Sequence, residues 1–259
     1  MEVTFKSDTN HRDMFFTPAH FAHPAKMVVP LLLWIVDRYT KPGDIILDPM
    51  AGCGTTMLGC RLGRNVILNE LEAKFVKMCE DNWLKVQTWG PEMGCTMGEC
   101  KIVQGDARQL DSVLVDAIIS SPPYADINTT GKANSYKGSH GPNSQVQIPD
   151  YRETSENIGN LKGETYLAAM LEVYQVCRRI LKPEGVLVLV TKNFIREQKE
   201  VSLDLDTIKL CEQAGFAFVE RHHRKLTNQG FWRTIYKQKY PDAPELTKED
   251  ILVFTNQMQ

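Results

Sequence analysis

The chain has no run of about 18 apolar residues, so nothing in it predicts a membrane span. Its first 30 residues contain Asp8, Asp13 and scattered polar groups, which is not typical of a secretory signal peptide. There is no internal repeat and no low-complexity tract. The net charge is −2, so the chain as a whole has no excess of basic residues that would indicate binding to nucleic acid. We therefore expect a globular, cytoplasmic protein.

Paired metal-ligand motifs are also lacking. The seven cysteines are irregularly spaced and no Cys-x-x-Cys occurs, which argues against a zinc site and favours reduced thiols. His222-His223 is a candidate metal pair, but the sequence offers no apparent carboxylate or cysteine partner nearby. We expect no metal.

Two nucleotide-binding motifs are missing as well. The glycines do not form Gly-x-Gly-x-x-Gly, and no Gly-Lys-Ser/Thr follows them. These absences disfavour a nicotinamide cofactor and a nucleoside triphosphate, respectively.

What the chain does have is a regular alternation of short apolar strands with helical patterns. This predicts a doubly wound, Rossmann-like α/β fold with a mostly parallel, seven-stranded sheet and an antiparallel edge strand. No linker divides residues 1–259, so we expect a single domain, with 125–162 as a polar inserted loop that becomes ordered on binding its target. Expected strands lie at 45–47, 66–68, 101–103, 117–119, 186–190, 216–219 and 251–254, and expected helices at 26–39, 56–61, 72–87, 163–181 and 203–214.

Several strands end in residues suited to one ligand, at the edge where such sheets bind ligands. The glycine-rich turn after the first strand lets a ligand approach the backbone, and a helix N-terminus there suits a carboxylate. An acid after the second strand can accept hydrogen bonds from a ribose diol, and one after the third from an adenine amino group. Asp48 is placed to meet an ammonium group. The candidate residues are Asp48, Met50, Ala51, Gly52, Cys53, Gly54, Thr55, Thr56, Glu70 and Asp106.

These segments, with Ser121-Pro122-Pro123-Tyr124 after the fourth strand, resemble the amino-group DNA methyltransferases that form N4-methylcytosine or N6-methyladenine. The resemblance covers about 20–125 and 163–195. It implies S-adenosylmethionine as cofactor, S-adenosylhomocysteine as product, and a prokaryotic or phage setting. In the family, the segment that corresponds to 21–26 helps to wrap the methionine end of the cofactor, which adds His23, Pro24 and Lys26 to the candidate cofactor site.

The resemblance assigns the catalytic role to Ser121, Pro122, Pro123 and Tyr124. Ser121 Oγ and the Pro122 carbonyl would accept hydrogen bonds from the target amino group, while Tyr124 would stack on a flipped-out base. The paired prolines would hold these acceptors rigid. Because the chain contains no Pro-Cys, we exclude the covalent route to carbon-5 cytosine methylation.

In that family, serine at the first motif position goes mostly with cytosine N4, and aspartate or asparagine with adenine N6. A hydroxyl can donate as well as accept, so it tolerates the N3 acceptor of cytosine, and the resemblance therefore favours cytosine N4. Adenine N6 in DNA stays open, as do guanine N2 in RNA and a cofactor-binding protein without catalysis. A homodimer and a partner restriction enzyme also stay open.

Two segments are candidates for contacting DNA, the expected substrate. One is the polar loop 125–162, and the other is the basic stretch 221–240, which contains no acid and for which a solvated edge strand and loop is an equal alternative. The candidate phosphate-binding residues are Lys132, Lys137, Arg221, Arg224, Lys225 and Arg233.

Overall fold

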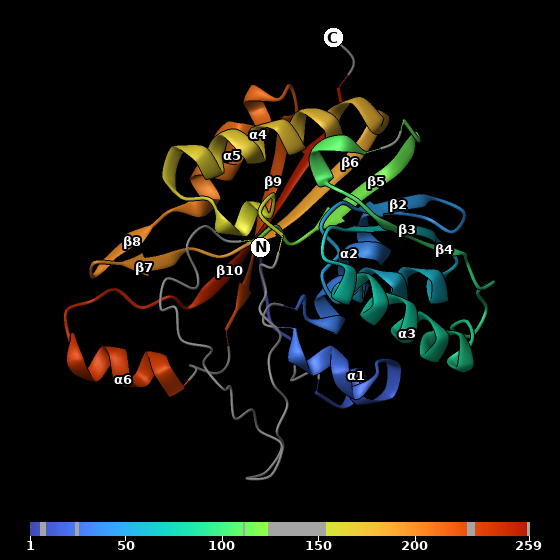
Figure 1. The fold of residues 1–259 in the computed structure, drawn as a ribbon, viewed down its shortest axis with the longest axis horizontal. Coiled ribbons are helices and arrows are strands. Elements are labelled where there is room, and N and C mark those ends of the chain that lie inside the picture. Colours follow the sequence, from blue (N-terminus) through green and yellow to red (C-terminus); the bar gives the residue numbers. More distant parts are fainter. Residues whose placement is uncertain (6–8, 24–25, 111, 124–153, 227–230, 258–259) are drawn as a thin grey trace.

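The computed structural model describes residues 1–5, 9–23, 26–110, 112–123, 154–226 and 231–257, with side chains omitted for 9–11, 21–22 and 231–234. An eight-stranded sheet runs through this part of the chain in the order β1-β9-β10-β6-β5-β2-β3-β4 (Figure 1). The strands are β1 (Glu2–Val3), β2 (Ile45–Asp48), β3 (Asn65–Glu70), β4 (Cys100–Gln104), β5 (Val115–Ser120), β6 (Leu181–Thr191), β9 (Ala217–Lys225) and β10 (Lys248–Thr255).

The expected fold class is confirmed, with two differences in the sheet. It has eight strands, because the two-residue β1 pairs in parallel with β9. The antiparallel strand is β10, and it lies between β6 and β9 instead of at the edge. A separate two-stranded ribbon, β7 (Phe194–Arg196) with β8 (Lys199–Val201), follows β6.

Helices cover both faces of the sheet, as continuous apolar strands require. Residues such as Ile46, Ile119 and Val190 face one core with α2 (Val29–Tyr39), while Leu47, Ile118 and Leu189 face the other with α4 (Gly163–Ile180) and α5 (Leu203–Gln213). Figure 1 shows α4 and α5 together on one side of the sheet. The remaining helices are α1 (Thr9–Phe15), α3 (Ala73–Trp89), α6 (Phe231–Lys239) and four short 3-10 segments, Pro18–Ala22, Thr55–Leu62, Ala107–Gln109 and Ile158–Asn160.

The expected elements are largely where the sequence places them, with longer strands. The helix expected from Lys26 begins at Val29, just before Pro30, because proline is well tolerated in a first helical turn. The segment after the glycine-rich turn is a 3-10 helix and not an α-helix. The first part of the basic stretch, 221–225, belongs to β9, and β1 pairs with its outer side at His223 and Arg224.

Candidate functional site

The carboxyl ends of five neighbouring parallel strands meet along one edge of the sheet. The pairings β3–β4, β2–β3, β2–β5 and β5–β6 are all parallel. They bring Asp48, Glu70, Asp106 and Ser121 to this edge, which we call the catalytic edge. Ligands bind beyond such an edge in doubly wound sheets.

The glycine-rich turn needs its glycines. Gly52 and Gly54 have φ of 57° and 77°, a backbone region that side chains disfavour. A Cβ on Gly52 would lie 2.9 Å from the His23 ring, and one on Gly54 would lie 2.7 Å from Met57 Cε. The turn is therefore held in a conformation that only glycine fits.

Asp48 points into the protein. Its carboxylate accepts hydrogen bonds from Thr56 Oγ1 at 2.6 Å, Ser120 Oγ at 2.8 Å and Met50 N at 3.3 Å. The residue is 4% exposed, and burial raises the pKa of its carboxyl group. Its hydrogen bonds thus tie together two parts of the protein, and the expected contact with a cofactor ammonium stays a prediction.

Glu70 joins the end of β3 to the glycine-rich turn. Its Oε2 accepts from Gly52 N at 2.7 Å and its Oε1 from Glu72 N at 2.9 Å. Burial raises the pKa of Glu70 to about 7, in spite of these two backbone donors, which lower it. A buried acid of this kind at a strand end is typical of a functional site.

This raised pKa has a defined effect on stability. Between the ordinary pKa of 4.5 and the folded value of about 7, the folded protein keeps a proton that the unfolded chain has lost. The contribution of Glu70 to stability is therefore full below pH 4.5 and falls as the pH rises to 7. We expect Glu70 to lower the free energy of unfolding of the wild type by about 3 kcal/mol between pH 5 and pH 8. Urea unfolding of Glu70→Gln at the two pH values should not show this decrease.

Glu80→Gln is the matched control, because Glu80 lies exposed on α3. It should leave the pH dependence of unfolding as in the wild type. Equal slopes for wild type and Glu70→Gln would contradict the raised pKa.

Asp106, the third strand-end acid, is bound by its own neighbour. Arg108 donates to both Asp106 carboxylate oxygens, with Nη2–Oδ2 at 2.6 Å, and also to the Glu156 carbonyl at 3.1 Å. Hydrogen bonds and charge from Arg108 lower the pKa of Asp106 despite its partial burial. The expected adenine contact would have to share this carboxylate with Arg108.

Glu72 is a site residue that the sequence reasoning missed. It accepts from Thr154 Oγ1 at 2.8 Å and from Asn157 Nδ2 at 2.7 Å. The last part of the expected target loop, 154–161, is thus attached beside Glu70. Residues 124–153, with Lys132, Lys137 and Tyr124, lie outside the described residues, as does Pro24.

The N-terminal segment supports the glycine-rich turn from behind. His23 is buried and packs edge-on against Phe75 at 4.5 Å, and Lys26 Nζ donates to the His23 carbonyl. Asn82 Nδ2 donates to the Cys53 carbonyl at 3.1 Å and lies 3.2 Å from His20 Nδ1. His20, whose pKa is lowered well below the usual value mainly by burial, and Asn82 were not singled out from the sequence.

The candidate catalytic motif is fixed by hydrogen bonds on both sides. Ser121 Oγ donates to the Val190 carbonyl of β6 at 3.2 Å, and Tyr166 of α4 donates to the Pro123 carbonyl at 2.7 Å. Pro122 is buried between them, while Ser121 and Pro123 are partly exposed. Tyr166 lies 43 residues away in sequence, so no local pattern could have found it.

The basic stretch 221–240 is less free than its composition suggests. Arg221 forms ion pairs with Asp204 and Asp250, and Arg224 pairs with Glu249 at 2.7 Å. Lys225 is exposed, and the Arg233 side chain lies outside the described residues.

The expectation that no carboxylate lies near His222-His223 is wrong. His222 Nε2 lies 3.1 Å from Glu220, and His223 Nδ1 lies 2.7 Å from Asp250. The first acid sits two residues away on the same strand, and the second comes from β10.

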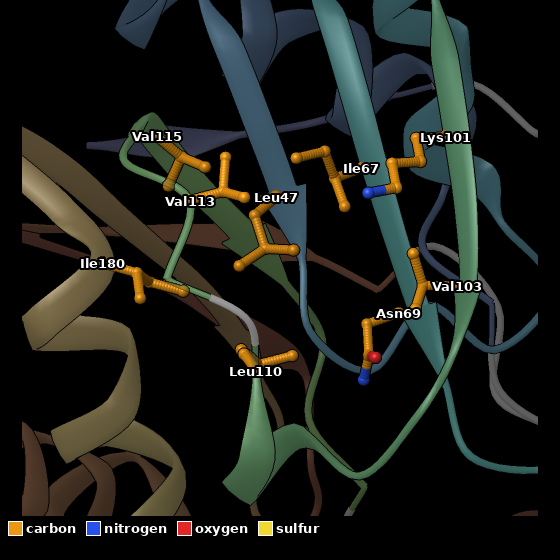
Figure 2. Close-up of a pocket in the computed structure, with 9 residues that line it drawn as sticks. All are labelled: Leu47, Ile67, Asn69, Lys101, Val103, Leu110, Val113, Val115 and Ile180. Atoms are coloured by element: carbon orange, nitrogen blue, oxygen red, sulfur yellow. The ribbon is translucent and has the colours of Figure 1, made fainter.

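A small pocket opens on the α4 side of the sheet, lined by residues of β2, β3 and β4 and by residues at the start of β5 (Figure 2). Its volume is about 40 Å³, far below the several hundred cubic ångströms of a typical ligand site. Because the pocket is this small and its lining is mostly apolar, we do not assign it to the cofactor. It is lined by Leu47, Ile67, Asn69, Lys101, Val103, Leu110, Val113, Val115 and Ile180.

Comparison with known proteins points to methyltransferases. A family model described as DNA methylase matches residues 3–81, from β1 into α3. A SAM-dependent methyltransferase from Methanosarcina mazei is 13% identical, with a TM-score of 0.52 over 87% of this chain and 98% of that one. A methyltransferase from Pyrococcus furiosus is 13% identical, with a TM-score of 0.51 over 91% of this chain and 87% of that one. A proposed RNA methyltransferase from Pyrococcus horikoshii is 17% identical, with a TM-score of 0.50 over 99% of this chain and 94% of that one.

At these identities the structural matches show the fold alone, which is the Rossmann-like fold of S-adenosylmethionine-dependent methyltransferases. The family match covers the glycine-rich turn and Glu70 but ends before Ser121. Both comparisons support S-adenosylmethionine as the cofactor. Within the described ranges no helix is long and apolar enough to cross a membrane, and no group of three or more histidines, cysteines or acids is arranged to hold a metal ion.

Proposed function

We propose that the protein methylates an exocyclic amino group of a nucleic-acid base, with cytosine N4 in DNA as the first candidate. The observation that carries this proposal is the hydrogen bond from Ser121 Oγ to the Val190 carbonyl. Because the hydroxyl proton is engaged there, the lone pairs of Ser121 Oγ are left to accept. An acceptor suits a substrate that presents N–H groups.

The residues at the catalytic edge fit S-adenosylmethionine. The turn at Gly52 and Gly54 follows β2 in a conformation that only glycine fits, and Glu70 lies beside it on the next strand. Gly52 to Thr56 would hold the methionine end, supported by His23, and Glu70 would accept from the ribose hydroxyls. When bound, the cofactor supplies an electrophilic methyl group on a positively charged sulfur.

The protein's own contribution is to make a poor nucleophile reactive. The lone pair of an exocyclic base nitrogen is delocalised into the ring. If Ser121 Oγ and the Pro122 carbonyl accept its two hydrogens, the nitrogen is drawn towards a tetrahedral geometry with a localised lone pair. The rigid Pro122-Pro123 backbone keeps both acceptors in place before the base arrives, so little reorganisation is needed in the transition state. Tyr124 would stack on the base.

The choice of base has less support than the type of reaction. The donation from Ser121 to Val190 competes with the donation to cytosine N3 that first favoured cytosine, because a hydroxyl has one proton. Cytosine N4 therefore keeps the family tendency alone as its support, and adenine N6 in DNA is the second candidate. For phosphate contacts, exposed Lys225 is the strongest of the described candidates, because Arg221 and Arg224 are already ion-paired.

Transfer of label tests which polymer is the substrate. The protein is incubated with S-adenosylmethionine carrying a tritiated methyl group and with unmodified DNA or RNA, and acid-precipitable label is counted. We expect label in DNA. Label in RNA alone would move the proposal to an RNA base, and label in neither polymer would favour a binding protein without catalysis.

The contact between Tyr166 and Pro123 gives a further prediction. Tyr166→Phe removes the hydrogen bond to the Pro123 carbonyl and lets the motif move, so we expect kcat to fall about tenfold while S-adenosylmethionine affinity changes little. Tyr174→Phe is the matched control, because Tyr174 is equally buried on the same helix but bonds to Thr207. Steady-state kinetics that give both variants the same kcat would contradict this role.

A further inference from the structure

A single buried carboxylate bridges the glycine-rich turn and the candidate catalytic motif. Asp48 Oδ2 accepts from Thr56 Oγ1 at 2.6 Å, and Asp48 Oδ1 accepts from Ser120 Oγ at 2.8 Å. Thr56 is the second residue of the helix that follows the turn, and Ser120 directly precedes Ser121. The bridge therefore connects the two segments that have to hold the cofactor and the target.

The bridge is closed to solvent. Ser120, Thr56 and Asp48 are 0%, 1% and 4% exposed. Hydrogen bonds to a charged acceptor in such surroundings are short and strong, and losing one leaves the carboxylate poorly solvated. The two bonds to this buried carboxylate thus add a side-chain link between the turn and the motif to the pairing of β2 with β5.

We propose that Asp48 and Ser120 are positioning residues, which set the distance and orientation of the catalytic motif relative to the cofactor turn. The inference rests on the proposed function, and it replaces the expected role of Asp48 as a partner of the cofactor ammonium. Methyl transfer requires in-line alignment of donor and acceptor, and a displacement of about 1 Å can lower a rate about 100-fold. A residue one position before Ser121 can control that alignment without touching the substrate.

The two roles of Asp48 predict opposite results for Asp48→Asn. Asparagine can still accept from Ser120 through Oδ1 and can donate to Thr56 Oγ1 through Nδ2, so it keeps both bridging bonds. If Asp48 is a positioning residue, the affinity for S-adenosylhomocysteine should stay within about threefold of wild type. If its charge binds the cofactor ammonium, that affinity should fall about tenfold or more.

Ser120→Ala breaks the bridge on the motif side only. We expect kcat to fall about 10- to 30-fold, with S-adenosylhomocysteine affinity, measured by calorimetry, within about threefold of wild type. Hydrogen exchange of a peptide spanning 115–123 should become faster, which needs no activity to observe. Thr207→Val is the control for loss of a buried hydroxyl, because Thr207 donates to Leu203 O within α5, and it should leave both constants unchanged.

The outcomes separate the two levels of the proposal. If Ser120→Ala has the kcat and the exchange rate of Thr207→Val, or if Asp48→Asn loses S-adenosylhomocysteine binding, the positioning role is overturned. If the wild type transfers no methyl group, the proposed function fails, while unchanged exchange in Ser120→Ala would separately refute the bridge. Loss of kcat with retained cofactor binding supports the positioning role.

Discussion

Ser121→Ala is expected to lower kcat by about 100- to 1000-fold and to leave S-adenosylmethionine affinity within about threefold of wild type. In the proposed mechanism the hydroxyl is one of two acceptors aimed at the target nitrogen, and its donation to the Val190 carbonyl fixes its direction. Alanine removes this acceptor. The glycine-rich turn follows the neighbouring strand β2, and we expect it to lose no contact, so binding and turnover should separate.

Ser112→Ala is the control for this experiment, because Ser112 is exposed in the loop before β5. Its kcat should equal that of wild type. Turnover by Ser121→Ala at the level of Ser112→Ala would remove Ser121 from the mechanism. An equal loss of turnover and of cofactor affinity would instead indicate a general disturbance of the site.

Gly52→Ala is expected to weaken S-adenosylmethionine binding about 100-fold and to cost about 1–2 kcal/mol of stability. Gly52 has φ of 57°, which alanine adopts at a cost, and its new Cβ would lie 2.9 Å from His23. The His23 ring cannot easily retreat, because it packs against Phe75. The turn must therefore shift, and the Gly52 N–H, which donates to Glu70 Oε2, must shift with it.

Gly94→Ala separates the two causes. Gly94 also has a positive φ, 82°, but nothing lies within 4 Å of an added Cβ. This variant should show a similar loss of stability in chemical unfolding and unchanged cofactor affinity in calorimetry. Equal affinities for Gly52→Ala and Gly94→Ala would show that the turn does not cradle the cofactor.

The order of strands and helices could be read from the sequence because each element is built from a local pattern. The run Val186 to Val190 is apolar throughout, and the observed β6 is buried there. The same logic placed Glu70 at a strand end, Ser121 directly after a strand and Gly52 in the turn that follows one, whereas the catalytic role of Ser121 is implied by the family resemblance and stays a prediction. The 3-10 form of Thr55–Leu62 did not, because it depends on tertiary packing of a short segment.

What the sequence could not supply is the direction in which strand-end side chains point and the partners that they find. Asp48 and Glu70 look alike as acids at strand ends, yet Asp48 is engaged by Ser120, 72 residues away. The sequence indicated a free cation at Arg221, but in the structure Arg221 forms an ion pair with Asp250 of β10. The extra strand β1 pairs Glu2 with His223, a contact too distant for any periodic pattern.

The most direct test of amino-group methylation is the identity of the methylated nucleoside. DNA and RNA are incubated with the protein and S-adenosylmethionine, digested to nucleosides and separated by liquid chromatography with mass spectrometry against authentic standards. The geometry around Ser121 predicts a base methylated on its exocyclic nitrogen, with N4-methylcytosine in DNA expected first. N6-methyladenine would correct the base alone, whereas 5-methylcytosine or a ring-nitrogen product would contradict the role of Ser121 and Pro122.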